Sequence, residues 1–202
     1  MSERSRAYEI LIVAISAAIF LGTSFSPPHL MDDVDAVQAQ ISRNMLESGD
    51  WVTARLDGVK YLEKPPLKYW MIAVSYMIFG IHDWAARLPI VLSAVALCWV
   101  VFRFGRWAFS PREGFFAALA LVTCIGLFLF TRVLIADVIL TLAVAVSLYG
   151  FLRCLDEQER NTRLWSAVFA GGIGCGLLLK GLIAAVFPIA ASGLFLLFTK
   201  EL

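Results

Sequence analysis

Charged residues interrupt two apolar stretches of this sequence. Arg132 and Asp137 lie at the start of one apolar run, and Lys180 lies at the end of another. Because a charged side chain at the centre of a bilayer costs roughly 2.5–3.5 kcal/mol on insertion scales, each is expected to be functional, paired or close to the membrane edge. Pairing of Arg132 with Asp137 and snorkelling of Lys180 to the interface are the plain alternatives.

A second group of acids opens the segment 32–48, which carries Asp32, Asp33 and Asp35 near its start. Its apolar residues recur at intervals of three and four: Val34, Val37, Ile41 and Met45. This spacing predicts an amphipathic helix that is ended by Gly49. The aspartates either cap the helix and complement its dipole, or hold one carboxylate beside the bilayer surface as a base.

A third group of charged residues, Glu63 and Lys64, directly precedes two prolines, Pro65 and Pro66. Proline fixes its own backbone and restricts the residue before it, so the pair is displayed from a stiff segment. A lysine held at headgroup level can neutralise a lipid phosphate. The plain alternative is an interfacial lysine that only snorkels.

Composition indicates which scaffold must position these groups. Of the 202 residues, 60% are hydrophobic and 16% are charged, and the mean hydropathy is +0.78. Soluble domains have about 45–50% apolar and about 25% charged residues, so the sequence is that of a membrane protein. The net charge of +1 gives no field that would attract nucleic acid.

Metal binding has little support in the sequence. The four cysteines lack C-x-x-C spacing and are expected to be buried hydrophobes, and neither His29 nor His82 is expected to be a ligand. No metal site and no cofactor are therefore predicted, with a divalent metal left as an open alternative.

An all-α integral membrane fold with about six spans follows from the apolar segments, since a span needs roughly 20 apolar residues. The six segments are 8–25, 88–103, 115–131, 134–152, 164–180 and 182–199. A further apolar stretch, 69–81, reaches only about 20 Å as a helix and is expected to lie at the interface. Residues 26–87 then form a long outer loop with interfacial helices at 32–48 and 69–81.

The arginines test this topology. With an inside N-terminus, every inner loop of the six-span arrangement is basic: Arg4, Arg6, Arg103, Arg106, Arg112, Arg153, Arg160, Arg163 and Lys200. This distribution agrees with the positive-inside rule, whereas a seventh span at 69–81 would turn the two arginine-rich loops outward. The charged groups at 132–137, at Lys180 and in the outer loop are therefore expected to meet on one face.

Four short motifs resemble a known family. Residues 45–53 (MLESGDWVT), 56–59 (LDGV), 61–67 (YLEKPPL) and 85–89 (AARLP) resemble the first outer loop of the polyprenyl-phosphate-sugar-dependent transferases. These are the aminoarabinose transferases of lipid A and the related protein O-mannosyltransferases. The resemblance extends from about residue 25 to Gly181 and implies a GT-C membrane glycosyltransferase fold, with juxtamembrane helices on the outer side of a helical bundle.

For the acid in the loop helix, the resemblance is uneven. The family has an Asp-Glu pair followed after two residues by Tyr, and its Asp is the catalytic carboxylate. Counting back from Met45 places that pair at Val34 and Asp35 and the tyrosine at Gln38, so this sequence departs from the pattern. Three alternatives follow: Asp33 supplies the carboxylate through a one-residue shift, Asp35 supplies it, or this branch has lost the chemistry. Asp33 is slightly preferred.

The other motifs match more directly. Tyr61, Glu63 and Lys64 fall in the loop motif whose lysine is implicated in holding the lipid phosphate. Arg132 and Asp137 fall in the motif that opens the fourth span, whose aspartate is functionally required in the family. Lys180 matches a lysine at the outer end of the fifth span, which points toward the sugar-phosphate site.

The resemblance implies transfer of a sugar from a polyprenyl-phosphate donor to a hydroxyl of a lipid, glycan or protein, at the periplasmic face of a bacterial inner membrane. Lys64 and Lys180, with Arg132 in a weaker role, would stabilise the leaving phosphate while an aspartate takes the proton. The partners expected are this donor, the acceptor and membrane lipids, without nucleic acid. A non-catalytic polyprenyl-phosphate binder and a structural subunit are the alternatives.

Family members are usually longer than this chain. Residues 1–202 are therefore expected to form a single transmembrane domain that corresponds to the N-terminal part of a longer architecture. A truncated enzyme, or a second chain that supplies further spans, would both fit this length.

Overall fold

A computed structural model describes residues 3–24, 29–30 and 33–199. Its elements in chain order are α1 (Glu3–Phe20), the 3-10 turn η1 (Gly22–Ser24), α2 (Asp33–Ser48), β1 (Arg55–Leu56), β2 (Val59–Lys60), α3 (Leu67–Phe79), α4 (Asp83–Ala108), α5 (Pro111–Val122), α6 (Ile125–Phe130), α7 (Asp137–Leu155), α8 (Thr162–Lys180) and α9 (Ile183–Thr199). These helices agree with the predicted all-α membrane fold. Among the described residues, the β-structure is one two-stranded antiparallel hairpin, β1–β2.

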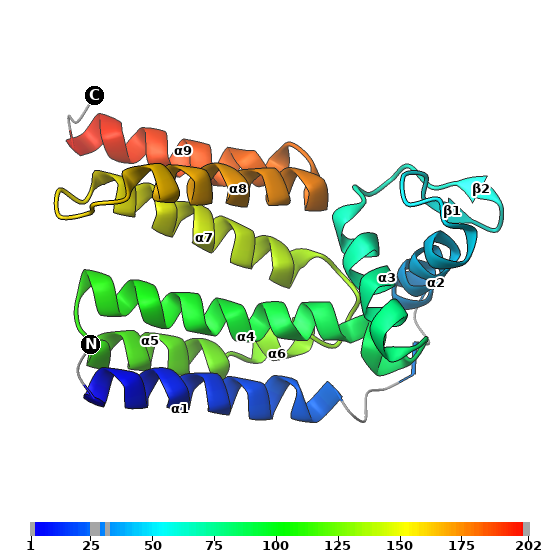
Figure 1. Cartoon of the computed structure of the whole chain (residues 1–202), viewed down its shortest axis with the longest axis horizontal. Helices are drawn as coiled ribbons and strands as arrows, with labels where there is room; N and C mark the ends of the chain where they lie inside the picture. Colours follow the sequence, from blue (N-terminus) through cyan, green and yellow to red (C-terminus); the bar gives the residue numbers. More distant parts are fainter. Residues whose placement is uncertain (1–2, 25–28, 31–32, 200–202) are drawn as a thin grey trace.

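The long helices form a bundle whose chain direction alternates from one helix to the next (Figure 1). α2, α3 and the β1–β2 hairpin gather at one end of this bundle, and α1 begins and α9 ends at the other. The connections that precede α7 and follow α8 lie at the same end as α2 and α3. The outer-loop segments and the two turns therefore meet, as the charge pattern predicts.

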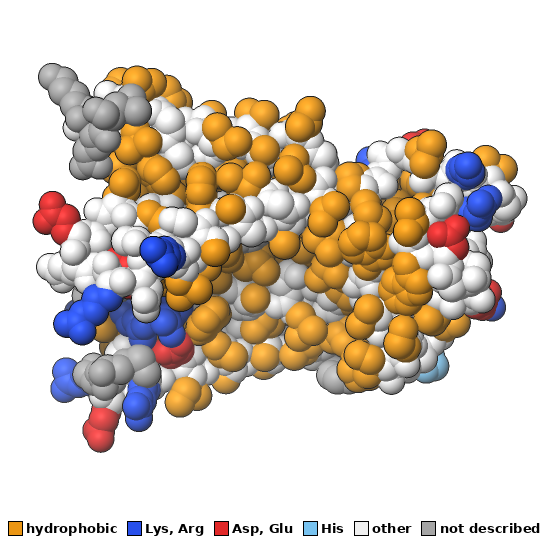
Figure 2. Space-filling view, turned by 45° about the horizontal axis from the view of Figure 1, so that its top comes forward, with side chains coloured by type: hydrophobic (Ala, Val, Ile, Leu, Met, Phe, Trp, Pro, Cys, Tyr) orange, Lys and Arg blue, Asp and Glu red, His pale blue; other side chains and the backbone are white. Residues whose placement is uncertain are grey.

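The distribution of side chains is that of a membrane-embedded bundle. Figure 2 shows a broad band of hydrophobic side chains with charged side chains at its two ends. Within the described residues, four segments are long and apolar enough to cross a membrane: Glu3–Ser24, Asp83–Ala108, Asp137–Leu155 and Thr162–Lys180. α9 is apolar but has only 17 residues, so the predicted count of six spans stays a prediction.

The apolar segment expected at 115–131 is divided into two helices, α5 and α6. The Thr123 hydroxyl donates to the carbonyls of Leu119 and Ala120, and the Cys124 N–H donates to the Leu121 carbonyl, three residues back. Hydroxyl bonds of this kind compete with the regular backbone ladder. The helix therefore ends at Val122 and resumes at Ile125.

The short helix α3 lies across the end of the bundle instead of along it (Figure 1). Its buried apolar residues recur at helical spacing on one side: Tyr69, Ile72, Ala73 and Tyr76. The helix ends at Gly80, which has a φ of 83° and whose N–H donates to the Tyr76 carbonyl. The interfacial position expected for 69–81 stays a prediction.

The loop helix α2 packs against α3 and carries the hairpin. Ile41 and Met45 are buried against Tyr69, whereas Val34 is 42% exposed. Gly49, with a φ of 72°, ends the helix as its sequence predicts. The predicted cap at Asp32 lies outside the described residues.

Close backbone approach holds α7 against α8. A Cβ placed on Gly172 would lie 2.3 Å from Ser147 Oγ and 2.7 Å from the Ala143 carbonyl oxygen. The Ser147 hydroxyl in turn donates to the Phe169 carbonyl at 2.9 Å. Only glycine fits at position 172 without moving the backbone of α7.

We therefore expect Gly172→Ala to lower the free energy of unfolding by about 1–3 kcal/mol, the usual cost of overpacking. Gly171→Ala is the matched control, because a Cβ there would meet nothing within 4 Å and alanine favours a helix. Thermal unfolding of both variants in detergent measures the difference. Equal melting temperatures would contradict the close packing of α7 on α8.

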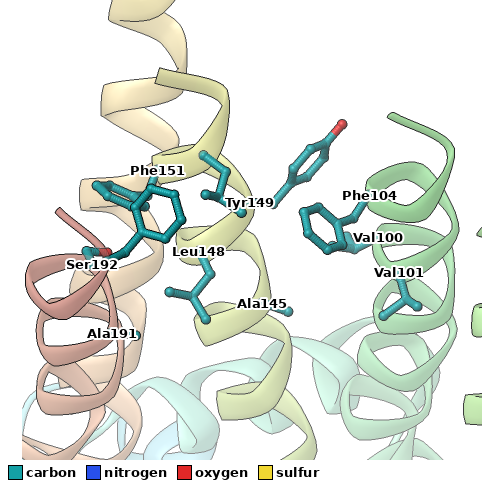
Figure 3. A pocket seen from close by; sticks show the side chains of 11 residues that line it. Val100, Val101, Phe104, Ala145, Leu148, Tyr149, Phe151, Ala191 and Ser192 are labelled. Carbon is teal, nitrogen blue, oxygen red and sulfur yellow. The ribbon is translucent and has the colours of Figure 1, made fainter. Parts of the chain in front are cut away.

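One cavity of the bundle is apolar. It has a volume of about 320 Å³ and lies between α4, α7 and α9, as Figure 3 shows. Val100, Phe104, Leu148 and Phe195 are typical of its lining, which includes no charged side chain. This cavity can accommodate hydrocarbon, but its lining offers no cation to pair with a phosphate.

Candidate functional site

A second cavity, of about 490 Å³, lies where the outer loop meets the ends of α7 and α8. Its polar and charged lining residues come from five separate segments: Gln38, Tyr61, Glu63, Lys64, Lys68, Asp137 and Lys180. Five of the eight predicted site residues therefore share one cavity. The three ionised lysines and two carboxylates give its lining a formal charge of +1.

Asp137 and Lys180 form an ion pair at the mouth of this cavity. Asp137 is the first residue of α7 and Lys180 is the last residue of α8, so each charge complements the dipole of its own helix. Their side chains are 35% and 38% exposed. Lys180 is held by a carboxylate and does not merely snorkel.

Glu63 is oriented by a tyrosine of the same loop. The Tyr61 hydroxyl donates to Glu63 Oε2 at 2.9 Å. Burial and the neighbouring carboxylate raise the pKa of Tyr61, so it remains a donor at neutral pH. Lys64, by contrast, has no hydrogen-bond or ion-pair partner among the described residues, and its side chain is free to take a ligand.

Asp35 is buried beside the cavity and is not among the residues that line it. Its Oδ1 accepts from the Leu134 N–H at 2.7 Å, and its Oδ2 accepts from Arg87 at 3.0 Å. Because both carboxylate oxygens are hydrogen-bonded within the protein, the position of Asp35 indicates a structural role. The side chain of Asp33, the preferred candidate for the base, lies outside the described residues, although α2 begins at that position.

Arg87 is a site residue for which the sequence predicts no role. It is 1% exposed, pairs with Asp35, and donates from Nε to the Arg132 carbonyl at 3.1 Å. Its motif, AARLP, supports the family resemblance, but a charge at the edge of an apolar run does not reveal a partner 52 residues away.

Arg132 does not reach the cavity. Its guanidinium donates to the Thr23 carbonyl at 2.6 Å and lies over the Phe128 ring at 5.7 Å. The alternative that Arg132 pairs with Asp137 is therefore wrong, because the Asp137 carboxylate is paired with Lys180. Arg132 instead connects the segment before α7 to η1.

Lys68 is the second site residue for which the sequence gives no expectation. Its side chain is buried, with 5% exposure, and Nζ donates to the Leu134 carbonyl at 3.1 Å. Burial lowers its pKa to about 8, and the charge of Lys64 acts in the same direction. The signal that the sequence offers is its position directly before the apolar stretch 69–81, and the structure makes it the second residue of α3.

Metal ligation has no support among the described residues, where no three His, Cys, Asp or Glu side chains are grouped to hold an ion. His29 lies 3.2 Å from Asp83 at an exposed position.

Comparison with known proteins shows which family this chain resembles. The family model described as "Dolichyl-phosphate-mannose-protein mannosyltransferase" matches residues 63–202. The undecaprenyl phosphate-alpha-4-amino-4-deoxy-L-arabinose arabinosyl transferase 1 of Proteus mirabilis is 35% identical over 159 residues, which are 74% of this chain and 28% of that protein. The corresponding transferase of Serratia proteamaculans is 29% identical over 185 residues, which are 88% of this chain and 33% of that one.

Solved structures show the same similarity in three dimensions. The structure of ArnT from Cupriavidus metallidurans bound to undecaprenyl phosphate matches with a TM-score of 0.88 and 29% identity, over 95% of this chain and 36% of that one. Its apo structure matches with the same TM-score over 96% of this chain. This chain spans about a third of the length of these relatives, and the predicted GT-C membrane fold is confirmed by the match.

Proposed function

Because this chain belongs to the dolichyl-phosphate-mannose-protein mannosyltransferase family, we propose that it forms the phosphate-binding side of a glycosyltransferase site that uses a polyprenyl-phosphate sugar. The observation that carries the proposal is the convergence of Lys64, Lys68 and Lys180 on one cavity at the end of a membrane bundle. Such a cavity suits a lipid carrier, since its phosphate can reach the lysines while its hydrocarbon stays in the bilayer.

The relatives indicate the donor class. The named relatives are transferases of an undecaprenyl phosphate-linked aminoarabinose, and the structural neighbour holds undecaprenyl phosphate. For this chain we infer an undecaprenyl-phosphate-linked sugar as donor. The acceptor is a hydroxyl of a lipid, glycan or protein at the same membrane surface.

The chemistry follows from the charge of the leaving group. An acceptor hydroxyl attacks the anomeric carbon, the bond from that carbon to the phosphate oxygen breaks, and its electron pair stays on the phosphate. Lysines that contact the phosphate stabilise the charge that develops there, which lowers the barrier more than ground-state binding alone would. Tyr61 holds the Glu63 carboxylate away from Lys64, which leaves that lysine available.

The proton of the acceptor goes to a carboxylate. Asp35 is occupied by Arg87 and the Leu134 N–H, so the role passes to Asp33 or Asp137. Asp137 lines the cavity, and α2 begins at Asp33 directly before Val34, which also lines it. Asp137 places a carboxylate at the cavity, as general base catalysis requires, whereas the side chain of Asp33 lies outside the described residues.

Charge supports an orientation for the site. The end of the bundle opposite the cavity holds Arg103 and Arg106, paired with Glu9, and Arg153, paired with Glu159. With the positive-inside rule, the cavity faces the periplasm of a bacterial inner membrane.

Binding of the lipid carrier tests the proposal. We expect the purified chain in phosphatidylcholine nanodiscs to bind undecaprenyl phosphate, and Lys64→Ala to weaken this binding about 10–100-fold, since a hydrogen bond to a charged group contributes about 1.5–3 kcal/mol. Lys60→Ala is the matched control, because Lys60 lies in the same loop but does not line the cavity. Absence of binding by the wild-type chain would overturn the proposed function.

A further inference from the structure

The partners that the described residues offer the buried Lys68 ammonium are neutral: the Leu134 carbonyl and the Tyr69 ring, whose centroid lies 5.5 Å from Nζ. Nζ contacts the Leu134 carbonyl, and among the described residues no carboxylate lies within 4.0 Å of it. An ammonium group has three N–H donors, so one carbonyl leaves two without an acceptor. A buried charge in this condition is costly unless something further binds it.

The charged groups that face Lys68 either are paired with other residues or carry the same positive charge. They are Lys64 from the loop before α3, Asp35 from α2, Asp137 from α7 and Lys180 from α8. Asp35 is paired with Arg87, and Asp137 is paired with Lys180. Lys68 lines the cavity, and within the described part of the chain no carboxylate is paired with it.

We propose that Lys68 is a phosphate-binding residue whose two unused N–H donors contact the phosphate of the lipid carrier inside the cavity. This inference rests on the proposed function and adds one residue to its phosphate site. The donor is a phosphodiester with one negative charge, whereas the carrier that remains after sugar transfer is a monoester with close to two at neutral pH. An additional buried cation therefore favours the state that forms as the anomeric carbon–oxygen bond breaks.

Titration of Lys68 makes this contact depend on pH. Burial brings its pKa to about 8, so the ammonium is present at pH 7 and is lost as the pH rises above 8. A phosphate monoester is fully ionised by then, because its second pKa is about 6. Binding of the lipid phosphate should therefore weaken between pH 7.5 and pH 9.5, while ordinary lysines remain charged to about pH 10.

The experiment measures binding of undecaprenyl phosphate to the full chain in phosphatidylcholine nanodiscs from pH 6.5 to pH 9.5. We expect wild-type affinity to fall about tenfold across the upper half of this range. Lys68→Met should bind about tenfold more weakly at pH 7 and show a flat profile above pH 7.5. Lys68→Arg, which keeps its charge, should stay within about threefold of wild type at pH 7 and remain flat to pH 9.5.

The controls separate this inference from the proposed function. Lys60→Met should keep the wild-type profile, because Lys60 is exposed on β2. If Lys68→Met keeps the wild-type affinity and pH profile while Lys64→Ala loses affinity, the role of Lys68 is overturned and the proposed function stands. If the wild-type chain binds no undecaprenyl phosphate, both are overturned. Displacement of the lipid by equimolar inorganic phosphate would overturn the lipid assignment in favour of a free anion.

Discussion

Replacing Arg87 with methionine is expected to lower the free energy of unfolding by about 3–5 kcal/mol. Arg87 is 1% exposed, and its removal leaves the Asp35 carboxylate buried without a cation. The Arg132 carbonyl also loses the donor that lies 3.1 Å away. Unfolding in detergent, followed by tryptophan fluorescence, measures the change.

An exposed ion pair supplies the control. Arg43 and Glu47 lie 2.7 Å apart on the surface of α2, with side chains 47% and 52% exposed. Arg43→Met should change stability by no more than about 0.5 kcal/mol, as is usual for surface pairs. The double variant Asp35→Leu/Arg87→Met should recover part of the loss, because no charge is then left unpaired. An Arg87→Met variant as stable as Arg43→Met would show that the buried pair does not hold α2 to α4.

The buried pair also determines where the segment before α7 lies. Asp35 accepts from the N–H of Leu134 and Lys68 donates to its carbonyl, so both sides of this residue are held by charged side chains. Arg87 fixes the Arg132 carbonyl two residues earlier. The segment 131–136 leads directly into Asp137, and its position is therefore set by α2, α3 and α4 together.

Hydropathy and charge predict the bundle and the end at which the site forms. In an up-and-down bundle, successive turns lie alternately at its two ends. The arginines indicate which end each turn occupies, and this places Lys64, Asp137 and Lys180 together before any distance is known. This prediction needs only the direction of each helix. The resemblance adds the family, which the comparisons confirm.

The partners of Asp35 could not be predicted in the same way. Its assignment as a possible base follows from its place near the start of an amphipathic helix, but which face of that helix meets α4 depends on how α2 packs on α3. Lys68 is similar: the sequence places it at the start of an apolar stretch, whereas its burial depends on the approach of Leu134 from a segment 66 residues away. Long-range pairing of this kind leaves no periodic signal in the sequence.

Replacing Asp137 is expected to reduce sugar transfer without weakening lipid binding. We expect Asp137→Asn to retain undecaprenyl phosphate or bind it up to about tenfold more tightly, and to lose sugar transfer by about 10²–10⁴-fold. Binding should not weaken because the asparagine removes a carboxylate that competes with the phosphate for Lys180. Transfer should fall because Lys180 is no longer held in one position and a carboxylate that can accept the proton is lost. Parallel titrations and a transfer assay with a labelled undecaprenyl-phosphate sugar measure the two effects.

Two further variants make this result specific. Lys180→Met should lose both binding and transfer, since it removes the cation instead of its competitor. Asp57→Asn should change neither, because Asp57 lies in the turn between β1 and β2, outside the cavity, and its positive φ of 50° suits asparagine equally well. An Asp137→Asn variant that binds weakly would mean that the carboxylate organises the cavity, whereas one that transfers sugar within threefold of wild type would exclude it as the base and leave Asp33 in that role.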